Sequence, residues 1–418
     1  MDIENLGRQA KEASYVLSKL TTKEKNQVLR NLVNALNESK DLILKANEED
    51  LKKAKENNLP DAMYARLKLD DKSFTSILND MLKVASLPDP VGEEYDGRKL
   101  ENGLKLVKRR EPLGVIGVIY EARPNVTIDI TSLCIKTGNV CILRGGKETL
   151  ATNIAMVKAI KNGLERSNLP KECVQYIDEP NREYVTELLH LDKYVDMIIP
   201  RGGEKLHELC RKESTIPVII GGFGVGHIFV DESADFEKSI DIIDNAKTQR
   251  PSACNSVDTI LVHEKIASSF IPKLSERLAQ KGVTIVTHNG ALEFVKDSKA
   301  KIIEGKEEDF KTEWLSLTLN LTIVKGLDEV LEHMRKCNAC HSDAILTNDY
   351  HNATRFVNEV GSACAYINTS TRFSDGGQFG LGAEVAISTQ KLHARGPMGL
   401  TELTTYKWIV ESDYQYRK

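Results

Sequence analysis

The sequence has few of the features that mark nucleic-acid-binding, membrane or disulfide-rich proteins. Lysine and arginine total 57 against 61 aspartates and glutamates, so a net charge of −4 provides no positive field for a nucleic acid or an anionic membrane. No stretch reaches the roughly 20 apolar residues that a membrane helix needs. Residues 1–20 lack the charged and then apolar segments of a signal peptide. We therefore expect a cytoplasmic protein whose eight cysteines are mostly free thiols.

Standard nucleotide and metal motifs are also missing. The glycine-rich stretch 221–226 does not fit G-x-G-x-x-G, and it leads into a strand-like run rather than a helix. Cys337, Cys340 and His341 form C-x-x-C-H, the pattern of haem c attachment, but that attachment requires an exported chain. A zinc site built on this motif would need a second ligand pair, and none stands at usable spacing. The sequence thus predicts no metal.

The periodicity that is present is typical of an α/β protein. Residues 1–85 have helical spacing, and Thr21 followed by Glu24 is a capping-box pattern. From residue 113 onward, apolar strand-like runs alternate with helical segments, which predicts a doubly wound parallel sheet. A second series of strands and helices predicts another α/β lobe over residues 250–383.

Two further segments predict strands outside these lobes. Asn102-Gly103 is a strong hairpin signal between alternating residues. Near the end of the chain, Tyr406, Trp408 and Val410 alternate with polar residues. Because an exposed strand of this kind favours association, it could serve with the hairpin as an oligomerisation element. The alternative is a strand added to one of the parent sheets.

Two glycine-containing turns are candidate phosphate sites. Gly202 and Gly203 lie where a strand-like run gives way to a helical one, so free amides and the helix dipole would face an anion. Arg144 and Lys147 follow the end of another strand. Cations at that place favour the 2′-phosphorylated nicotinamide cofactor, NADP(H), over NAD.

Asn125 and Cys254 are the candidate reactive residues. The amide of Asn125 lies at a strand-to-helix turn, where it could either donate to a developing oxyanion or cap the helix. Cys254 could be a buried packing residue. Its position between the two lobes and its small neighbours, including Ser252 and Asn255, favour a nucleophile instead. Arg250 would lower the thiol pKa if it faces the cleft.

Long segments of the chain resemble the γ-glutamyl phosphate reductases, a family within the aldehyde dehydrogenase superfamily. The resemblance spans nearly the whole chain and is carried in order by residues 111–127, 143–148, 249–259, 379–384 and 388–408. It implies an aldehyde dehydrogenase-like fold of two α/β lobes with a small β oligomerisation element. The implied divisions are an NADP(H)-binding domain at 1–96 and 112–249, a catalytic domain at 250–383, and an oligomerisation hairpin and C-terminal strand at 97–111 and 384–418.

The resemblance also implies roles for individual residues. Cys254 matches the nucleophile and Asn125 the oxyanion amide. Four residues match the cofactor site: Arg144 and Lys147 on the adenosine ribose side, and Gly202 and Gly203 on the pyrophosphate side. Glu313 falls where the superfamily has a glutamate holding the nicotinamide ribose.

The implied activity is the NADPH-dependent reduction of L-glutamyl 5-phosphate to L-glutamate 5-semialdehyde and phosphate, in proline biosynthesis. Ile219 occupies the place of the glutamate that activates water in hydrolytic aldehyde dehydrogenases, and isoleucine cannot deprotonate water. A CoA-acylating aldehyde dehydrogenase is the close alternative, and a cysteine hydrolase with a histidine base is a distant one.

The resemblance also raises hypotheses about the contacts with the substrate and with partner proteins. The α-carboxylate of the substrate needs a cation or a group of backbone amides to bind it. The candidates are His393, Arg395 and the amides of Gly380 and Gly382. For Arg395, a structural ion pair is the alternative. A homo-oligomer is expected. Association with glutamate 5-kinase, which makes this unstable acyl phosphate, is a further hypothesis, and no residue of the sequence argues for it.

Overall fold

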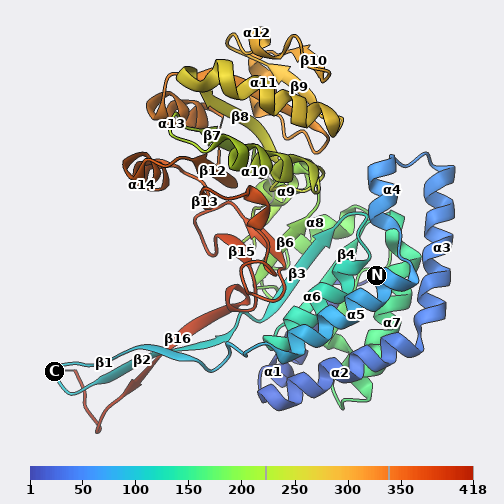
Figure 1. Cartoon of the computed structure of the whole chain (residues 1–418). Coiled ribbons are helices and arrows are strands. Elements are labelled where there is room, and N and C mark those ends of the chain that lie inside the picture. Colours follow the sequence, from blue (N-terminus) through green and yellow to red (C-terminus); the bar gives the residue numbers. More distant parts are fainter. Residues whose placement is uncertain (222–223, 338, 418) are drawn as a thin grey trace. The chain divides into compact units, whose positions relative to one another are not determined.

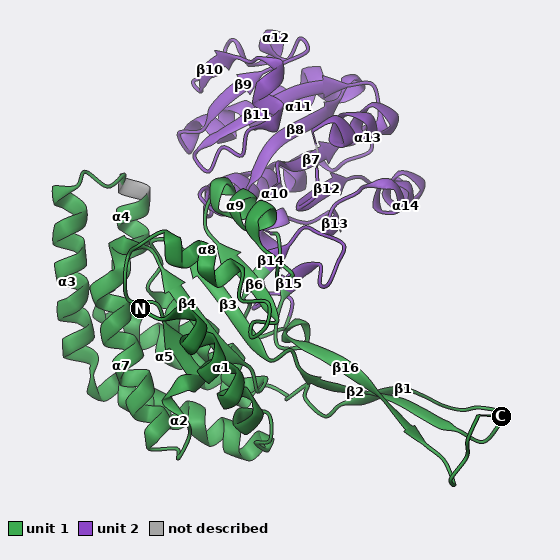
Figure 2. Cartoon of the chain, turned by 180° about the vertical axis from the view of Figure 1, so that it is seen from behind, with its two compact units in different colours: residues 1–220, 380–386, 398–418 green, residues 221–379, 387–397 purple. Residues whose placement is uncertain are grey.

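A computed structural model describes residues 1–221, 224–337 and 339–417 of the chain. The chain divides into two compact units, shown in different colours in Figure 2. Unit 1 comprises residues 1–220, 380–386 and 398–418, and unit 2 comprises residues 221–379 and 387–397. None of the helices in the described ranges combines the length and the apolar character that a membrane crossing requires.

The amino-terminal part of unit 1 consists of the five helices α1 to α5, which Figure 1 labels. The predicted capping box begins the second of them, because the Thr21 side chain accepts from the Glu24 N–H and the Glu24 carboxylate accepts from the Thr21 N–H. Val28, Leu29 and Leu32 of the predicted apolar stripe are buried. The helices are α1 (Ile3–Leu17), α2 (Thr22–Glu38), α3 (Lys40–Glu56), α4 (Asp61–Leu67) and α5 (Asp71–Ser86).

A four-stranded parallel sheet forms the core of unit 1, in the order β5-β4-β3-β6. The chain moves outward from β3 to β4 and β5 and then returns to the other side of β3, so the sheet has a switch point between β3 and β6. Its strands are β3 (Val115–Tyr120), β4 (Val140–Gly145), β5 (Val174–Tyr176) and β6 (Met197–Arg201). The connecting elements are α6 (Asn125–Lys136), η1 (Lys147–Thr149), α7 (Leu150–Glu165), η2 (Lys171–Cys173), α8 (Glu183–Leu189) and α9 (Glu204–Glu213).

The predicted hairpin and tail strand form a separate antiparallel sheet in the order β1-β2-β16. Its strands are β1 (Glu94–Lys99), β2 (Lys105–Pro112) and β16 (Thr404–Glu411), preceded by η5 (Thr401–Leu403). They extend as an arm from the rest of unit 1 (Figure 2). The tail strand therefore does not join the parent sheet. Tyr406, Trp408 and Val410 remain 46%, 42% and 55% exposed, so the strand carries the apolar surface that its sequence predicts.

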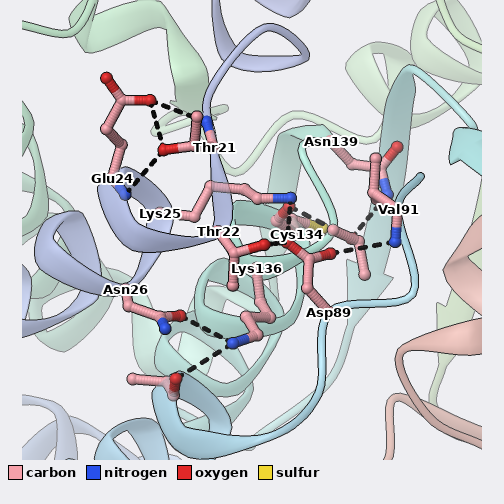
Figure 3. A network of polar contacts seen from close by, with 12 residues as sticks. Thr21, Thr22, Glu24, Lys25, Asn26, Asp89, Val91, Cys134, Lys136 and Asn139 are labelled. Carbon is pink, nitrogen blue, oxygen red and sulfur yellow. Dashed lines mark hydrogen bonds and ion pairs between the residues drawn. The ribbon is translucent and has the colours of Figure 1, made fainter. Parts of the chain in front are cut away.

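A buried polar network fixes the segment that leads into this arm (Figure 3). Lys25 on α2 pairs with Asp89 at 2.5 Å, and the two side chains are only 2% and 5% exposed. Asp89 also accepts from the Val91 N–H at 3.0 Å. Beside it, the Lys136 ammonium donates to Asn26 at 2.7 Å and to the backbone carbonyl of Ala85 at 3.0 Å. Two buried lysines are thus satisfied by oxygen atoms, as burial of a charge requires.

Unit 2 is built on a seven-stranded parallel sheet in the order β10-β9-β11-β8-β7-β12-β13. Its strands are β7 (Gly226–Val230), β8 (Val257–His263), β9 (Thr284–Thr287), β10 (Lys301–Glu304), β11 (Thr318–Val324), β12 (Ser342–Leu346) and β13 (Cys364–Ile367). The other elements are α10 (Phe236–Thr248), α11 (Glu264–Gln280), α12 (Leu292–Val295), η3 (Glu307–Lys311), α13 (Leu327–Lys336), α14 (Tyr350–Glu359) and η4 (Thr371–Phe373). Strands β14 (Ala386–Ser388) and β15 (Gly396–Met398) form a two-stranded sheet.

The α/β class and the second series of strands predicted from the sequence are confirmed. The boundary between the observed units differs from the predicted domain boundary, because it follows Ile220 rather than residue 249. The physical reason is that β7 pairs with both β8 and β12, which makes it a central strand of the second sheet. Gly222 and Phe223, in the glycine-rich stretch before β7, and Asn338, in the C-x-x-C-H stretch, lie outside the described residues.

Candidate active site

The carboxyl ends of β3 and β6 form the candidate cofactor edge of unit 1. Adjacent strands end at Tyr120 and Arg201, which are paired in register, and the Glu121 N–H donates to the Arg201 carbonyl at 3.1 Å. Gly202 and Gly203 follow immediately and lead into α9. Ligands of open α/β sheets bind at such a switch point, outside the carboxyl ends of the strands.

A carboxylate already rests at the start of α9. The Gly203 N–H donates to the Glu121 carboxylate at 2.9 Å. A Cβ on Gly202 would lie 2.6 Å from the same carboxylate, so only glycine allows this approach. The start of the helix therefore binds an anionic oxygen, as its dipole and free amides favour. The predicted phosphate site fits an anion, and Glu121 competes for it.

Arg144 and Lys147 lie at the carboxyl end of β4, the strand next to β3. The Arg144 guanidinium donates to the backbone carbonyls of Gly145 at 2.9 Å and Pro180 at 3.4 Å. Burial lowers the pKa of Arg144 from its usual range. Lys147 is exposed at the start of η1. These two cations are carried on the same sheet edge as the glycines.

Asn125 does not cap a helix with its side chain. It is the first residue of α6, and Pro124 occupies the N-cap position without a side-chain capping bond. The Asn125 amide nitrogen instead donates to the Asp129 carboxylate, one turn later, at 2.8 Å. The capping alternative considered from the sequence is therefore wrong. The bond uses one amide hydrogen and leaves the other for a second acceptor.

Asp129 and Arg201 extend this group and were not found from the sequence. Burial raises the pKa of Asp129 to about 6, although the Asn125 amide and the Arg201 charge act to lower it. Burial, together with Arg201, lowers the pKa of the neighbouring His207 to about 4. Arg201 and Glu121 each come directly after the apolar residues of a strand. That position, at the carboxyl end of a buried strand, is the signal that could have identified these two residues.

Cys254 lies in the turn between α10 and β8 of unit 2. It is half-buried and forms no disulfide. The turn is held from both sides: the Asn255 side-chain amide donates to the Ser374 carbonyl at 2.9 Å, and the Thr371 hydroxyl donates to the Asn255 carbonyl at 2.7 Å. The Ala253 N–H also donates to the Arg250 carbonyl at 3.1 Å. The cysteine is thus presented by a backbone that is fixed by η4.

The segment that contains Glu313 is attached to the strand that follows Cys254. Asp258 on β8 accepts from the Trp314 N–H at 3.1 Å, which places Glu313 beside the same buried charges. Lys247 on α10 lies 3.5 Å from Asp258, and both side chains are at most 2% exposed. Burial lowers the pKa of Lys247, while the charges of Asp258 and Glu313 act to raise it.

The candidate substrate residues are divided between the units. His393 and Arg395 belong to unit 2 and Gly380 and Gly382 to unit 1. The Arg395 guanidinium donates to the Gly361 carbonyl, which is a backbone contact rather than an ion pair. Arg395 lines a pocket of about 350 Å³ in unit 2. Both glycines have positive φ, at 74° and 76°, a conformation that other residues rarely adopt.

The structure therefore brings the predicted residues together in two groups. Unit 1 carries Asn125, Arg144, Lys147, Gly202 and Gly203 at the carboxyl edge of one sheet. Unit 2 carries the nucleophile candidate and its neighbours at the start of β8. Ile219, which the resemblance places where a hydrolytic enzyme has a carboxylate, is 3% exposed, and its N–H donates to the Ile198 carbonyl at 2.9 Å.

Comparison with known proteins assigns this architecture to a family. The model of the aldehyde dehydrogenase family matches residues 1–288, more than half of the chain. The chain belongs to the aldehyde dehydrogenase family. Members of this family are oxidoreductases that use a nicotinamide cofactor, as the edge of the unit 1 sheet suggests.

Relatives within the family are similar over their full length. The γ-glutamyl phosphate reductase of Photobacterium profundum is 56% identical over 417 residues, with 100% of both chains covered. The crystal structure of γ-glutamyl phosphate reductase from Thermotoga maritima is 43% identical, with a TM-score of 0.96 and full coverage of both chains. An acetylating aldehyde dehydrogenase from Geobacillus thermoglucosidasius is 18% identical with a TM-score of 0.71, covering 100% of this chain and 98% of that one, which shows the shared fold. The resemblance predicted from the motifs is confirmed.

Proposed function

We propose that this aldehyde dehydrogenase family member reduces L-glutamyl 5-phosphate to L-glutamate 5-semialdehyde and phosphate with NADPH, the second step of proline biosynthesis from glutamate. The observation that carries this conclusion is the full-length likeness to γ-glutamyl phosphate reductases, at 56% identity in one relative. The chemistry of the two groups of residues described above is consistent with it, as the following steps explain.

Cys254 acts as the nucleophile. Its thiolate attacks the γ-acyl carbon, the carbon–oxygen bond to phosphate breaks, and phosphate leaves with the bonding electrons. The developing oxyanion receives a hydrogen bond from the second amide hydrogen of Asn125 and from the Cys254 N–H, and a donor of this kind contributes roughly 3–4 kcal/mol to catalysis. Asp129 holds the Asn125 amide in place through the 2.8 Å bond. The product of this step is a thioester on Cys254.

The cofactor would be held by residues of both groups. Gly202 and Gly203 take the pyrophosphate, Arg144 and Lys147 take the 2′-phosphate of the adenosine ribose, and Glu313 takes the nicotinamide ribose. The fit is supported by the hydrogen bond that the Gly203 N–H already donates to an anionic oxygen, that of the Glu121 carboxylate. Bound NADPH supplies the hydride that reduces the thioester. The resulting thiohemiacetal collapses to release the semialdehyde and restore the Cys254 thiolate.

Ile219 explains why this enzyme would not hydrolyse its thioester to an acid, as hydrolytic aldehyde dehydrogenases do. A buried isoleucine offers no base to activate water, so the thioester lasts until hydride, or phosphate in the reverse direction, consumes it. His393, Arg395 and the amides at Gly380 and Gly382 are proposed to hold the α-carboxylate of the glutamyl group. For Arg395, a purely structural role is the competing hypothesis, and substrate affinity in Arg395→Ala, with folding checked by circular dichroism, distinguishes the two.

The proposal extends to the assembly and the cellular location of the enzyme. The exposed apolar residues of β16 favour a homo-oligomer assembled through the three-stranded sheet. The enzyme would act in the cytoplasm, a reducing compartment in which its cysteines stay free thiols. Transfer of the labile acyl phosphate from glutamate 5-kinase by direct contact remains a hypothesis without a residue to support it.

The test runs the reaction backwards. Purified enzyme is given L-glutamate 5-semialdehyde, NADP⁺ and inorganic phosphate, and NADPH formation is followed by absorbance. We expect turnover that requires phosphate and is lost in Cys254→Ala, while NADPH binding by that variant stays nearly intact. Steady turnover with coenzyme A in place of phosphate would favour the CoA-acylating alternative. Substantial activity in Cys254→Ala would contradict the covalent mechanism.

A further inference from the structure

Two histidines and a cysteine gather in unit 2 among residues to which the proposed reaction assigns no role. His227 comes from β7, His333 from α13, and Cys337 is the residue after α13. One ligand atom from each of the three lies within 4.8 Å of the others. We propose that this cluster binds one Zn²⁺ ion, with these three side chains as its protein ligands.

The spacing within α13 suits a metal ion. His333 and Cys337 are four residues apart, so they lie on one face of the helix. The Cys337 N–H donates to the His333 carbonyl at 2.9 Å, which continues the helical geometry to the cysteine. The Cys337 Sγ lies 3.6 Å from the His333 Nε2. Tetrahedral zinc with bonds of about 2.3 Å to sulfur and 2.05 Å to nitrogen separates those two atoms by about 3.6 Å.

His227 presents the third donor atom. Its side chain is fully buried, and its Nδ1 lies 2.9 Å from the Asp343 carboxylate. The other ring nitrogen, Nε2, is buried and makes no hydrogen bond of ordinary geometry; its interaction partner is the Cys337 thiol. A thiol is only a weak hydrogen-bond partner for a buried ring nitrogen. An ion between Nε2 and the Cys337 Sγ would give both atoms a strong partner.

Asp343 supplies the support that metal-binding histidines usually have. Its Oδ1 accepts from the His227 backbone N–H at 2.8 Å and also contacts the ring nitrogen. Its Oδ2 accepts from the Ser362 hydroxyl. A carboxylate on the far nitrogen of a histidine fixes the ring orientation and makes the nitrogen that faces the metal a better donor.

The donor set favours zinc over the hard cations. One thiolate and two imidazoles suit Zn²⁺, whereas Mg²⁺ and Ca²⁺ prefer oxygen ligands. His333 is only half-buried, which leaves a side open for entry of the ion and for a water as fourth ligand. The Phe310 ring packs edge-on against His333, with 4.6 Å between centroids, and limits that opening. The ion would tie β7 to α13.

The cluster differs from the C-x-x-C-H motif in the sequence. Of that motif, only Cys337 takes part. His341 is turned toward Ser342, with 2.8 Å between Nδ1 and Oγ, and Cys340 lines the pocket that also contains Arg395. The expectation of no metal rested on the lack of a second ligand pair near the motif. The fold supplies the additional ligands from α13 and from a strand far away in the sequence.

The experiment uses the full chain freed of metal by a chelator and titrated with Co²⁺ as a spectroscopic probe for zinc. We expect one Co²⁺ per chain, with the visible bands of a tetrahedral site and a near-ultraviolet thiolate-to-cobalt band. Zn²⁺ should displace the cobalt and raise the melting temperature of the wild type. Asp343→Asn should weaken binding roughly 10- to 100-fold while leaving the thiolate band in place.

Matched variants locate the ion. Cys337→Ala should abolish the thiolate band and the thermal shift, and His333→Ala, at a half-buried position, should weaken binding at least tenfold. Cys364→Ala, at another buried cysteine of the same unit, should retain both signals. Absence of the thiolate band at one equivalent of Co²⁺ would overturn the proposal. A band that survives Cys337→Ala and disappears in Cys254→Ala would do the same, because the ion would then sit on the nucleophile.

Discussion

Replacing Asp129 by asparagine tests whether the carboxylate beside Asn125 is buried at a cost in stability, and replacing it by alanine tests whether it positions the Asn125 amide. Asp129 accepts from the Asn125 amide, and burial raises its pKa from 3.8 to about 6. Because the folded protein binds this proton more tightly than the unfolded chain, the carboxyl group costs stability as the pH rises above 3.8. The cost levels off above pH 6. A shift of about two pKa units corresponds to about 3 kcal/mol.

The pH dependence of that cost can be stated in advance. From the two pKa values, the cost is about 2 kcal/mol at pH 5 and about 3 kcal/mol at pH 7. Asp129→Asn cannot ionise, so its stability relative to wild type should increase by about 1 kcal/mol between these pH values. Its side-chain oxygen still accepts from Asn125, so kcat should change little, whereas Asp129→Ala should lower kcat by releasing the amide.

The assay is urea unfolding of wild type and both variants at pH 5, 6 and 7, together with reverse-reaction kinetics. Asp178→Asn, an exposed aspartate of the same unit, serves as the control and should show no such trend. A stability difference between Asp129→Asn and wild type that does not vary with pH would refute the buried-carboxylate reasoning. Unchanged kcat in Asp129→Ala would refute the positioning role.

Three further predictions concern unit 1. Asp89→Ala should lower the free energy of unfolding by about 3–5 kcal/mol, because it leaves the buried Lys25 without its counter-charge. Replacing both Lys25 and Asp89 by apolar residues should recover much of that loss, which a double-mutant cycle measures. Glu121→Gln should tighten NADPH binding severalfold in a fluorescence titration, because it removes a negative charge from the anion site at the Gly203 N–H; weaker binding would show that the carboxylate helps to hold the cofactor. Neutral residues at both Arg144 and Lys147 should raise the KM for NADPH far more than that for NADH, and equal effects would contradict their contact with the 2′-phosphate.

The sequence predicts the individual helices and strands of this fold better than it predicts which of them belong to the same sheet or unit. Periodicity and the capping box at Thr21 identify helices and strands because these signals are local. The boundary after Ile220 could not be predicted, because it depends on β7 pairing between β8 and β12, and β12 lies more than a hundred residues away. For the tail strand, alternation predicts an exposed apolar face, but only the register with β2 shows that it avoids the parent sheet.

The candidate site shows the same limit. Cys254 could be chosen from its turn and small neighbours, and the resemblance to a family implies its role as nucleophile, which stays a prediction. Asn125 was ambiguous because asparagine at a helix start usually caps, and the competing partner, Asp129, becomes visible only when α6 is built. The approach of Glu121 to Gly203 and the meeting of His227 with α13 join residues distant in sequence, so no local pattern could reveal them.

The central claim is that Cys254 carries an acyl group that water does not remove. Its direct test is intact-protein mass spectrometry of the enzyme mixed with L-glutamate 5-semialdehyde and NADP⁺ in the absence of phosphate. The account predicts a glutamyl adduct on Cys254 that persists for many turnover times and disappears when phosphate is added. Rapid loss of the adduct to free glutamate without phosphate, or an adduct that forms equally in Cys254→Ala, would contradict it.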